Sequence, residues 1–534
     1  MAAGHERLTG TGPPKDRRLE GPINPMQNKR DQVQAHMFLM SRLTSGILRS
    51  DPDAPESPQG RTNRGIAIGI IIAVLVAVGA FVVGLVSPGK QNAWQTSGHL
   101  IVDKGTGARY LYLDGRLRPV RNYTSAKLLG GAKLATTTVS SASLKGTPRG
   151  TPVGIEGAPD ELPAKGDLSQ APWQVCVSAV PRNGGTALVT TLAVGREGDG
   201  DRPGRDQGLL VAGPDGSDYL IWQGSRLRID RESTAAEALG YASVRPVPVS
   251  AAFLNALPAG PDLAAPAVEG AGGAGPALGG RPTKFGQLFT LAVPGAGERH
   301  YVLRADGLAP VTATELALLL ADPGIRAKAY GGAVPVPAAL TSDALQGRSA
   351  PDAGRAARPG RMPETPPKAV SVPRDRTPCA LVTPDAKGPR FGITLAPVAD
   401  LGPVAQHASG IAAPACLPVD RVTVRPGRGS LVRLVGAGGG QLGGTLYLVT
   451  ETGVKYRLAT AAAVKALGYQ DVVPGEIPAL LPAMLPSGPD LTPEAAAAGR
   501  AAVTAPRCPS RASGEAAAAA DRPGSPAGDN GKTR

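Results

Sequence analysis

Residues 219–241 read YLIWQGSRLRIDRESTAAEALGY, and residues 447–469 read YLVTETGVKYRLATAAAVKALGY. The tyrosines that bound the two stretches, and the later Leu263 and Leu491, keep one offset of 228 residues. In each stretch two short apolar runs around a glycine turn predict a β-hairpin. The segment that follows, ending in Leu-Gly-Tyr, predicts a short helix closed by glycine, which adopts the left-handed backbone conformation without steric cost. A repeat of this kind indicates a modular fold.

Two weaker copies of the pattern occur elsewhere. One runs from Tyr110 through Asp114-Gly115 to Gly130, and the other from Tyr301 through Asp306-Gly307 to Leu320. The four copies predict an α+β, strand-rich domain in which each unit is a β-hairpin followed by a helix. Strands between about 172 and 430 that belong to no copy are expected to build a central β core. The further strands expected between the copies are 175–177, 209–210, 422–424 and 431–435.

The composition excludes one large core. The chain has 534 residues, of which 71 are Gly and 53 are Pro, and only 4% are aromatic. Such a chain is expected to form small, turn-rich modules separated by linkers. The formal net charge is +14. The positive side chains are scattered beside Pro and Gly without interleaved aromatics, so the charge does not indicate nucleic-acid binding.

One stretch is apolar enough to cross a membrane. Gly65–Val86 contains 22 residues without a charge, which as a helix extend about 33 Å, enough for the hydrocarbon core. A buried core helix would show a polar stripe, and a cleavable signal peptide would lie nearer the start of the chain. Arg49, Arg61 and Arg64 precede the stretch, whereas Lys90 follows it. The positive-inside rule therefore predicts a single-pass protein with a cytoplasmic N-terminus and the C-terminal part outside.

Before this stretch, residues 30–49 predict an amphipathic helix. Apolar side chains recur at three- and four-residue spacing, at Val33, Met37, Met40, Leu43, Ile47 and Leu48. Two interpretations remain open: a helix that lies on the membrane surface, and a packing face for a partner protein. Residues 1–25, rich in Gly, Pro and charge, are expected to be disordered.

No motif predicts a catalytic, cofactor-binding or metal site. Gly84–Lys90 fits the start of a phosphate-binding loop, but Gln91 stands where magnesium coordination needs Ser or Thr. Gly438–Gly443 matches G-x-G-x-x-G, yet strands are expected on both sides, whereas a dinucleotide site needs a helix after the loop. The five histidines are far apart. We therefore assign no catalytic residue, no cofactor and no metal.

The four cysteines all follow the apolar stretch. Cys176, Cys379, Cys416 and Cys508 would thus face an oxidising compartment, where disulfides persist. Four cysteines allow three pairings.

The opening of the chain resembles that of EccB, the membrane-anchored core component of type VII (ESX) secretion systems. The resemblance rests on Lys29–Phe38 (KRDQVQAHMF), Arg42-Leu43, Ser50–Asp53 and the basic pair before the apolar stretch. It covers nearly everything from Met26 to about Leu491, departing in the N-terminal extension and the Pro-rich insert before Cys379. It implies a β-rich core flanked by repeat domains.

The resemblance implies a structural subunit of the secretion membrane complex that supports export of small helical-hairpin proteins. Its partners would be EccC-, EccD- and EccE-type subunits in an oligomeric assembly. Two alternatives remain: a membrane-anchored cell-wall-binding protein, with peptidoglycan as partner and no role in secretion, and a nucleotide-hydrolysing subunit. An ATPase activity is attributed to some members of the family, but no nucleotide-binding motif supports it in this sequence.

The domain organisation follows from these patterns. The expected segments are a disordered N-terminal extension (1–25), a cytoplasmic amphipathic helix with linker (26–64), the transmembrane helix (65–86), repeat 1 (87–150), the start of the core with repeat 2 (172–263), repeat 3 (283–342), a Pro-rich linker (343–378), the return of the core (379–435), repeat 4 (436–491) and a largely disordered tail (492–534).

The positions of the cysteines favour one pairing. Cys176 follows Trp173 in a short strand where the core starts, and Cys379 precedes an apolar run where the core returns. Each lies beside a connector, so a bond between them would join the edges of the core. We therefore expect Cys176 to pair with Cys379, which leaves Cys416 to pair with Cys508.

Overall fold

The computed structural model describes residues 29–49, 58–86, 93–96, 98–182, 184–197, 200–229, 234–295, 297–351, 362–401, 404, 413–436, 439–504 and 508. The chain divides into two compact units, Met1–Lys90 and Gln91–Arg534, and each is described by itself. The extension predicted to be disordered (1–25) and most of the tail after 504 lie outside the described residues.

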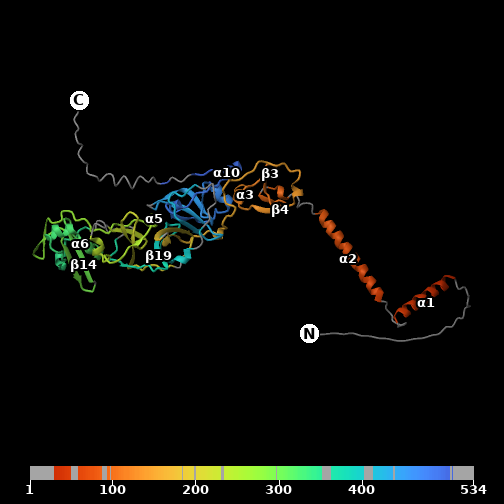
Figure 1. The fold of residues 1–534 in the computed structure, drawn as a ribbon, viewed down its shortest axis with the longest axis horizontal. Coiled ribbons are helices and arrows are strands. Elements are labelled where there is room, and N and C mark those ends of the chain that lie inside the picture. The colour runs from red at the N-terminus through yellow and green to blue at the C-terminus, as the bar shows by residue number, and fades with distance from the viewer. Residues whose placement is uncertain are drawn as a thin grey trace, which may run out of the picture. The chain divides into compact units, whose positions relative to one another are not determined.

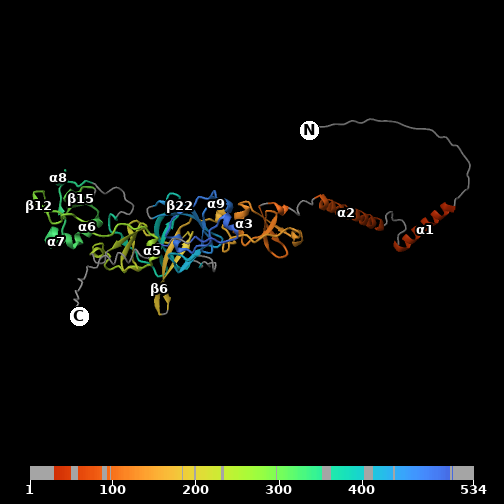
Figure 2. The same ribbon diagram turned by 90° about the horizontal axis from the view of Figure 1, so that it is seen from above.

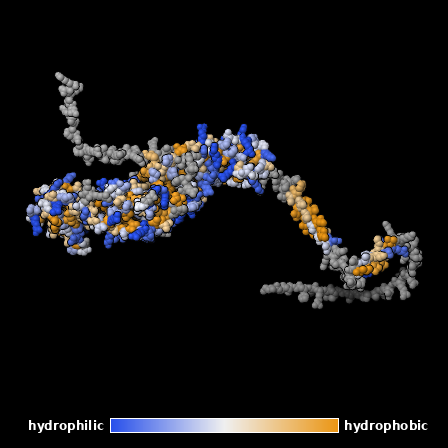
Figure 3. All heavy atoms as spheres, viewed as in Figure 1, coloured by the Kyte–Doolittle hydropathy of each residue, from blue (hydrophilic) through white to orange (hydrophobic). Residues whose placement is uncertain are grey.

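The described residues of the first unit form two helices, α1 (Lys29–Arg49) and α2 (Pro58–Val86) (Figure 1). Within α2, Thr62–Val82 is long and apolar enough to cross a membrane, and none of it is buried by the rest of the chain. Hydrophobic residues cover most of the length of α2 in Figure 3. Because such a surface is unfavourable in water, it fits a lipid environment.

In the second unit all four repeats share one topology. Three antiparallel strands are followed by a helix and a fourth strand that pairs in parallel with the first, giving the order third, second, first, fourth. Repeat 1 comprises β1 (His99–Asp103), β2 (Arg109–Leu113), β3 (Arg116–Pro119), α3 (Tyr123–Gly130) and β4 (Ala135–Val139). Repeat 2 comprises β7 (Gln207–Ala212), β8 (Asp218–Trp222), β9 (Ser225–Ile229), α4 (Ala235–Ala238), β10 (Val247–Pro248) and the following α5 (Ala251–Asn255).

The other two repeats follow the same plan. Repeat 3 comprises β13 (Leu288–Val293), β14 (Gly297–Arg304), β15 (Gly307–Val311), α6 (Ala313–Ala321), α7 (Pro323–Tyr330), β16 (Ala338–Ala339) and α8 (Ser342–Leu345). It is preceded by the hairpin of β11 (Ala274–Leu278) and β12 (Arg281–Lys284). Repeat 4 comprises β21 (Ser430–Val435), β22 (Gln441–Val449), β23 (Lys455–Leu458), α9 (Ala461–Leu467) and β24 (Gly475–Pro478).

The α+β architecture of repeats around a β core is confirmed, but the expected hairpin-and-helix unit was incomplete. Strands 209–210 and 431–435, expected between the copies, are the first strands of repeats 2 and 4. They belong to these repeats because β7 pairs antiparallel with β8, and β21 pairs antiparallel with β22. Repeat 4 therefore begins near Ser430 rather than at residue 436, and the return of the core ends before it.

After the fourth strand of each repeat, the chain returns beside the third strand. The backbone N–H of Arg226 donates to Pro258 O at 3.0 Å, and that of Lys455 donates to Pro486 O at 3.0 Å. In repeat 1, Leu117 N–H donates to Pro148 O at 2.8 Å. A proline supplies an acceptor without needing a donor partner. The Leu-Pro and Gly-Pro-Asp-Leu pattern that closes repeats 2 and 4 thus builds this return segment.

The turn between the second and third strands needs glycine in two repeats. Asp114 and Gly115 have φ of 51° and 75°, and Gln223 and Gly224 have φ of 46° and 78°. Positive φ at both central residues defines the type I′ turn, whose twist suits a hairpin. A Cβ on Gly224 would also lie 2.4 Å from the carbonyl oxygen of Phe391, so this turn packs directly against the core.

The core is a five-stranded sheet with the order β19-β18-β5-β6-β20. Its strands are β5 (Trp173–Arg182), β6 (Gly185–Val194), β18 (Arg376–Thr383), β19 (Arg390–Pro397) and β20 (Arg421–Val424). Buried side chains of this sheet pack in one cluster with side chains of repeats 2 and 4, among them Trp173, Leu192, Leu209, Phe253, Val432 and Leu481. Repeats 2 and 4 are therefore held by the core itself.

Helices join the repeats in pairs. In repeats 1 and 4, the Lys127 ammonium group of α3 donates to Leu467 O at the end of α9 at 3.2 Å. A cation is favourable at the C-terminal end of a helix. In repeats 2 and 3, α4 lies against α6, and the Thr234 hydroxyl donates to Ala321 O at 2.7 Å. The large unit thus contains a repeat 1–repeat 4 pair and a repeat 2–repeat 3 pair.

Part of the tail expected to be disordered is a helix, α10 (Pro493–Ala498). Thr492 caps its start, Pro493 occupies the first turn and Gly499 ends it with φ of 66°. Ala496 is fully buried, and α10 contacts both α3 and α9. The Ala-rich sequence folds because it has this surface to pack on. In the Pro-rich linker, likewise, β17 (Lys368–Ala369) pairs with β7.

Candidate functional surfaces

The apolar face of α1 is exposed along the described part of the helix. Its large hydrophobic side chains are 55–79% accessible at the positions Val33, Met37, Phe38, Leu39, Met40, Leu43 and Ile47. An uncovered apolar stripe of this size marks an interaction surface. The predicted helix is present, and its spacing places most of these side chains on one side.

The cysteines form two disulfides. Cys176 is bonded to Cys379 between the paired strands β5 and β18, and both residues are fully buried. Cys416 is bonded to Cys508, which joins the segment before β20 to the tail after α10. These are the pairs expected from the sequence.

One buried cation lies in repeat 4. Lys455 is 4% exposed, and its ammonium group donates to Pro482 O at 2.5 Å and Leu485 O at 2.7 Å. Burial lowers the pKa of Lys455 to about 8. With acceptors from the return segment, the side chain fixes that segment to β23. Sequence reasoning missed this residue, because one lysine in a short strand gives no signal.

Beside Lys455, polar contacts fasten the tail. The Asp490 carboxylate accepts from Arg457 at 2.9 Å and from the Thr504 hydroxyl at 2.5 Å. The backbone N–H of Asp490 donates to Ala502 O at 2.7 Å. Together with the Cys416–Cys508 bond, these contacts hold the segment 499–504 against repeat 4.

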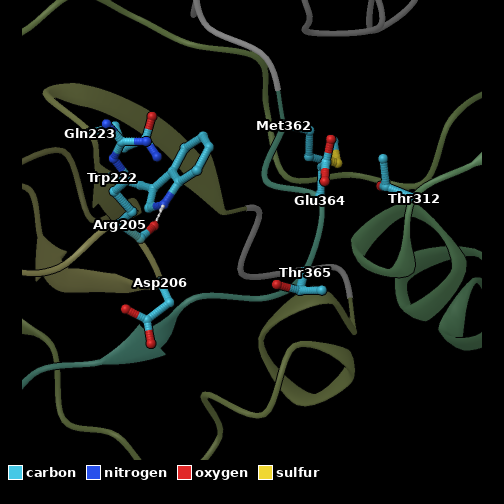
Figure 4. A pocket seen from close by; sticks show the side chains of 8 residues that line it. All are labelled: Arg205, Asp206, Trp222, Gln223, Thr312, Met362, Glu364 and Thr365. Carbon is cyan, nitrogen blue, oxygen red and sulfur yellow. Dashed lines mark hydrogen bonds between the residues drawn. The ribbon is translucent and has the colours of Figure 1, made fainter. Parts of the chain in front are cut away.

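A cavity of about 530 Å³ opens beside the hairpin turn of repeat 2 (Figure 4). The Trp222 indole N–H donates to Arg205 O at 2.8 Å, which fixes the ring at the cavity wall. The lining combines this aromatic ring with carboxylate, amide and hydroxyl groups, from Arg205, Asp206, Trp222, Gln223, Thr312, Met362, Glu364 and Thr365. An aromatic ring among polar groups suits a ligand with apolar and hydroxylated faces.

Only parts of the two glycine motifs lie among the described residues. The described part of the second motif, Gly439–Gly443, lies where β21 turns into β22. Gly84 to Val86 lie at the end of α2, and residues 87–90 are outside the described part of the chain. Among the described residues, no group of three His, Cys, Asp or Glu side chains could hold a metal ion.

Comparison with known proteins gives one consistent family. Residues 26–505 match the model of the family described as type VII secretion system ESX-1, transport TM domain B. The protein named ESX-3 secretion system ATPase EccB3 of Mycolicibacterium smegmatis is 29% identical over 488 residues, covering 86% of this chain and 91% of that protein. The ESX-2 secretion system ATPase EccB2 of Mycobacterium tuberculosis is 30% identical over 495 residues, covering 89% and 96%.

Solved structures show the same fold. A chain of an intact ESX-5 inner membrane complex superposes with a TM-score of 0.61 at 22% identity, covering 92% of this chain and 99% of that chain. A chain of the EccB3 dimer from the ESX-3 core complex superposes with a TM-score of 0.60 at 26% identity, covering 74% and 99%.

Proposed function

This chain belongs to the EccB family and is a structural subunit of the type VII secretion membrane complex; we propose that it acts there as a self-associating scaffold anchored by α2. In this proposal α1 is cytoplasmic and the large unit lies outside the membrane. The observation that carries it is the order of parts along the chain: an exposed amphipathic helix, then an apolar span, then a large packed unit. The solved relatives from an ESX-5 inner membrane complex and an EccB3 dimer support an assembled state.

The orientation can be tested with reporters. Alkaline phosphatase fused after Thr504 should be active, because the enzyme requires an oxidising compartment, whereas the same enzyme fused after Arg49 should be inactive. The opposite pattern would overturn the proposed topology.

The partners proposed for α1 are EccC-, EccD- and EccE-type subunits. Leu43→Asp places a charge in the apolar face, 57% exposed in the structure, without touching α2. We expect normal membrane insertion but loss of the EccC-type ATPase from a pull-down in mild detergent. Gln34→Asp adds the same charge on the polar side and should leave the complex intact. An intact complex in the Leu43→Asp variant would instead favour α1 as a membrane-surface helix.

The cavity beside Trp222 supports a second candidate function, binding of peptidoglycan. Sugar rings stack their apolar faces on aromatic side chains and bond to carboxylates and amides, which this lining offers. Full-length protein in detergent should sediment with purified peptidoglycan, and Trp222→Ala should abolish sedimentation while Trp222→Phe retains part of it. Equal sedimentation of the three proteins, or none for the wild type, would remove this function.

The names of the relatives also contain the word ATPase. In this chain we assign no catalytic step to the described residues, and the scaffold function does not depend on one. Phosphate release by purified protein, followed across an additional purification step, decides the point: activity that co-purifies quantitatively with the chain would add an enzymatic function.

A further inference from the structure

The β5–β6 hairpin extends beyond the sheet to which it belongs. The two strands pair from Gln174 opposite Ala193 to Arg182 opposite Gly185. The strands on either side pair with only part of this hairpin. β18 pairs with β5 over Trp173–Cys176, and β20 pairs with β6 over Thr191–Val194. Figure 2 shows the hairpin, labelled β6, projecting from the body of the large unit. We call residues 179–182 and 185–189 the arm.

Side chains close the sheet at the level where the arm begins. On the β6 side, the Asp420 carboxylate accepts from the backbone N–H of Thr190 at 2.7 Å. On the β5 side, the Thr377 hydroxyl donates to Val177 O at 2.6 Å. Beyond this level no other described strand pairs with the arm, and its residues are all exposed or half-exposed.

The two edges of the arm differ. Val177 and Thr190 form a pair whose outward backbone groups meet Thr377 and Asp420. Because outward and inward pairs alternate along an antiparallel hairpin, the pairs Ala179–Leu188 and Pro181–Thr186 also direct their backbone groups outward. On β5 the outward position 181 is a proline, which has no N–H to donate. On β6, Thr186 and Leu188 both offer an outward N–H and C=O.

The β6 edge lacks the usual protection against strand pairing. Natural edge strands carry Lys, Pro or an inward charge, whereas residues 185–189 are Gly-Thr-Ala-Leu-Val. The Leu188 side chain is 40% exposed. The arm carries a single charged side chain, Arg182, at its tip. A two-stranded ribbon is marginally stable alone in water and gains from a third strand.

We propose that the β6 edge of the arm pairs antiparallel with the same edge of a second copy of this chain, around a twofold axis at Ala187. This inference rests on the self-association proposed above and names its contact. Thr186 of one copy then lies opposite Leu188 of the other, and the two reciprocal pairs exchange four backbone hydrogen bonds. A second copy fits because an antiparallel contact of one edge with itself closes a dimer and leaves no further edge. The arm also brings no like charges face to face along this contact, and a solved relative is a dimer.

The geometry gives a direct test. At the axis the two Ala187 residues form a non-hydrogen-bonded pair, with Cα atoms about 4.5 Å apart, which is within the range of a disulfide. Ala187→Cys in the full-length chain in membranes should form an intermolecular disulfide under mild oxidation. Ala179→Cys, on the opposite edge of the same arm, is the matched control and should not. Cross-linking of the two variants to the same extent would overturn the inference.

A second pair of variants removes the contact without a new cysteine. Leu188→Pro deletes an outward N–H and should weaken self-association of the detergent-solubilised protein by at least about tenfold, because two bonds of the ladder are lost. Ala179→Pro removes an outward N–H from the β5 edge, where Pro181 already lacks one, and should leave self-association unchanged.

The outcomes separate this inference from the scaffold function. Dimers of unchanged stability in the Leu188→Pro variant would overturn the β6 contact but retain the scaffold. A wild-type protein that is monomeric and recovers no partner would overturn the scaffold itself. Cross-linking of Ala187→Cys to another subunit would overturn the choice of a second copy as occupant.

Discussion

The hydroxyl group of Tyr469 donates a 2.7 Å hydrogen bond to the backbone carbonyl of Pro163. Tyr241, the matching residue of repeat 2, makes the same bond at 2.7 Å to Pro367. Burial raises the pKa of Tyr241 to about 12 and that of Tyr469 further. Pro163 lies in the segment between repeat 1 and β5, and Pro367 lies in the Pro-rich linker (343–378). These two connecting segments are thus fastened to the repeats.

Removing the Tyr469 hydroxyl should destabilise the large unit. In Tyr469→Phe, the Pro163 carbonyl loses its partner in a buried site, which costs about 1–3 kcal/mol. Tyr112→Phe is a suitable control, because it keeps the ring that packs edge-on against Trp94. Urea unfolding of both variants measures the difference. Equal midpoints would show that the bond contributes nothing.

Gly224→Ala tests the contact between repeat 2 and the core. The new methyl group would meet Phe391 O at 2.4 Å, and φ at this position is 78°. Gly216→Ala has nearly the same φ, 80°, but nothing lies within 4 Å of its Cβ. The control should lose about 1 kcal/mol from the backbone conformation alone, and Gly224→Ala at least about 2 kcal/mol more. Similar melting temperatures for the two variants would contradict the close packing seen here.

Lys455 makes stability depend on pH above neutrality. Its folded pKa of about 8 is lower than that of a free lysine, so between pH 8 and about 10 the unfolded chain binds more protons. Stability should therefore rise with pH across this window, by an amount on the order of 2–3 kcal/mol. The rise should be absent in Lys455→Met and unchanged in Lys133→Met, a substitution of an exposed lysine. Chemical unfolding at pH 7.5, 8.5 and 9.5 checks the slope; a flat wild-type profile would count against it.

A charge in the middle of α2 should prevent membrane insertion. Ala77→Arg places a guanidinium near the centre of the apolar stretch Gly65–Val86, at a cost of about 2.5–3.5 kcal/mol on insertion scales. Ala77→Leu keeps the span apolar and should insert as the wild type does. Membrane fractionation measures the outcome, and equal membrane levels for both variants would argue against a spanning helix.

The Cys176–Cys379 bond should be important for stability, because it closes a loop with a sequence separation of 203. In the chain-entropy model, Cys176→Ser costs about 5 kcal/mol, less any strain in the native bond. It should also leave Cys379 open to alkylation once the protein unfolds. Cys416→Ser removes the bond between two cysteines that are 92 residues apart in the sequence. This variant should release the tail and leave the core folded. Non-reducing peptide mapping checks both; a Cys176–Cys416 or Cys176–Cys508 peptide would refute the pairing.

The sequence was informative where a short segment determines its own conformation. The apolar run of α2, the spacing in α1 and the Asp114-Gly115 turn each show their structure locally. The fourth strands could not be predicted in the same way. β10 and β16 contain two residues each and exist only because the first strand of their repeat offers an edge.

The candidate surfaces likewise differ in whether a short segment of sequence determines them. The exposed face of α1 follows from spacing, whereas Lys455 and the cavity beside Trp222 are assembled from segments that meet only in the folded chain. For α10 an Ala-rich stretch carries no amphipathic pattern, so its helix depends on the surface of α3 and α9. In repeat 1, likewise, the residue with positive φ after the helix is Gly131 and not Gly130, a shift that local sequence does not distinguish.

Two fastenings determine how the large unit would bear a mechanical load on its tail. The chain enters this unit through repeat 1, and the backbone N–H of Gly154 donates directly to Ala496 O of α10 at 2.8 Å. After α10 the Cys416–Cys508 bond joins the tail to the segment before β20. A pull on the tail would therefore reach the core of the large unit through a covalent bond, and the α3–α10 contact would not bear the load alone.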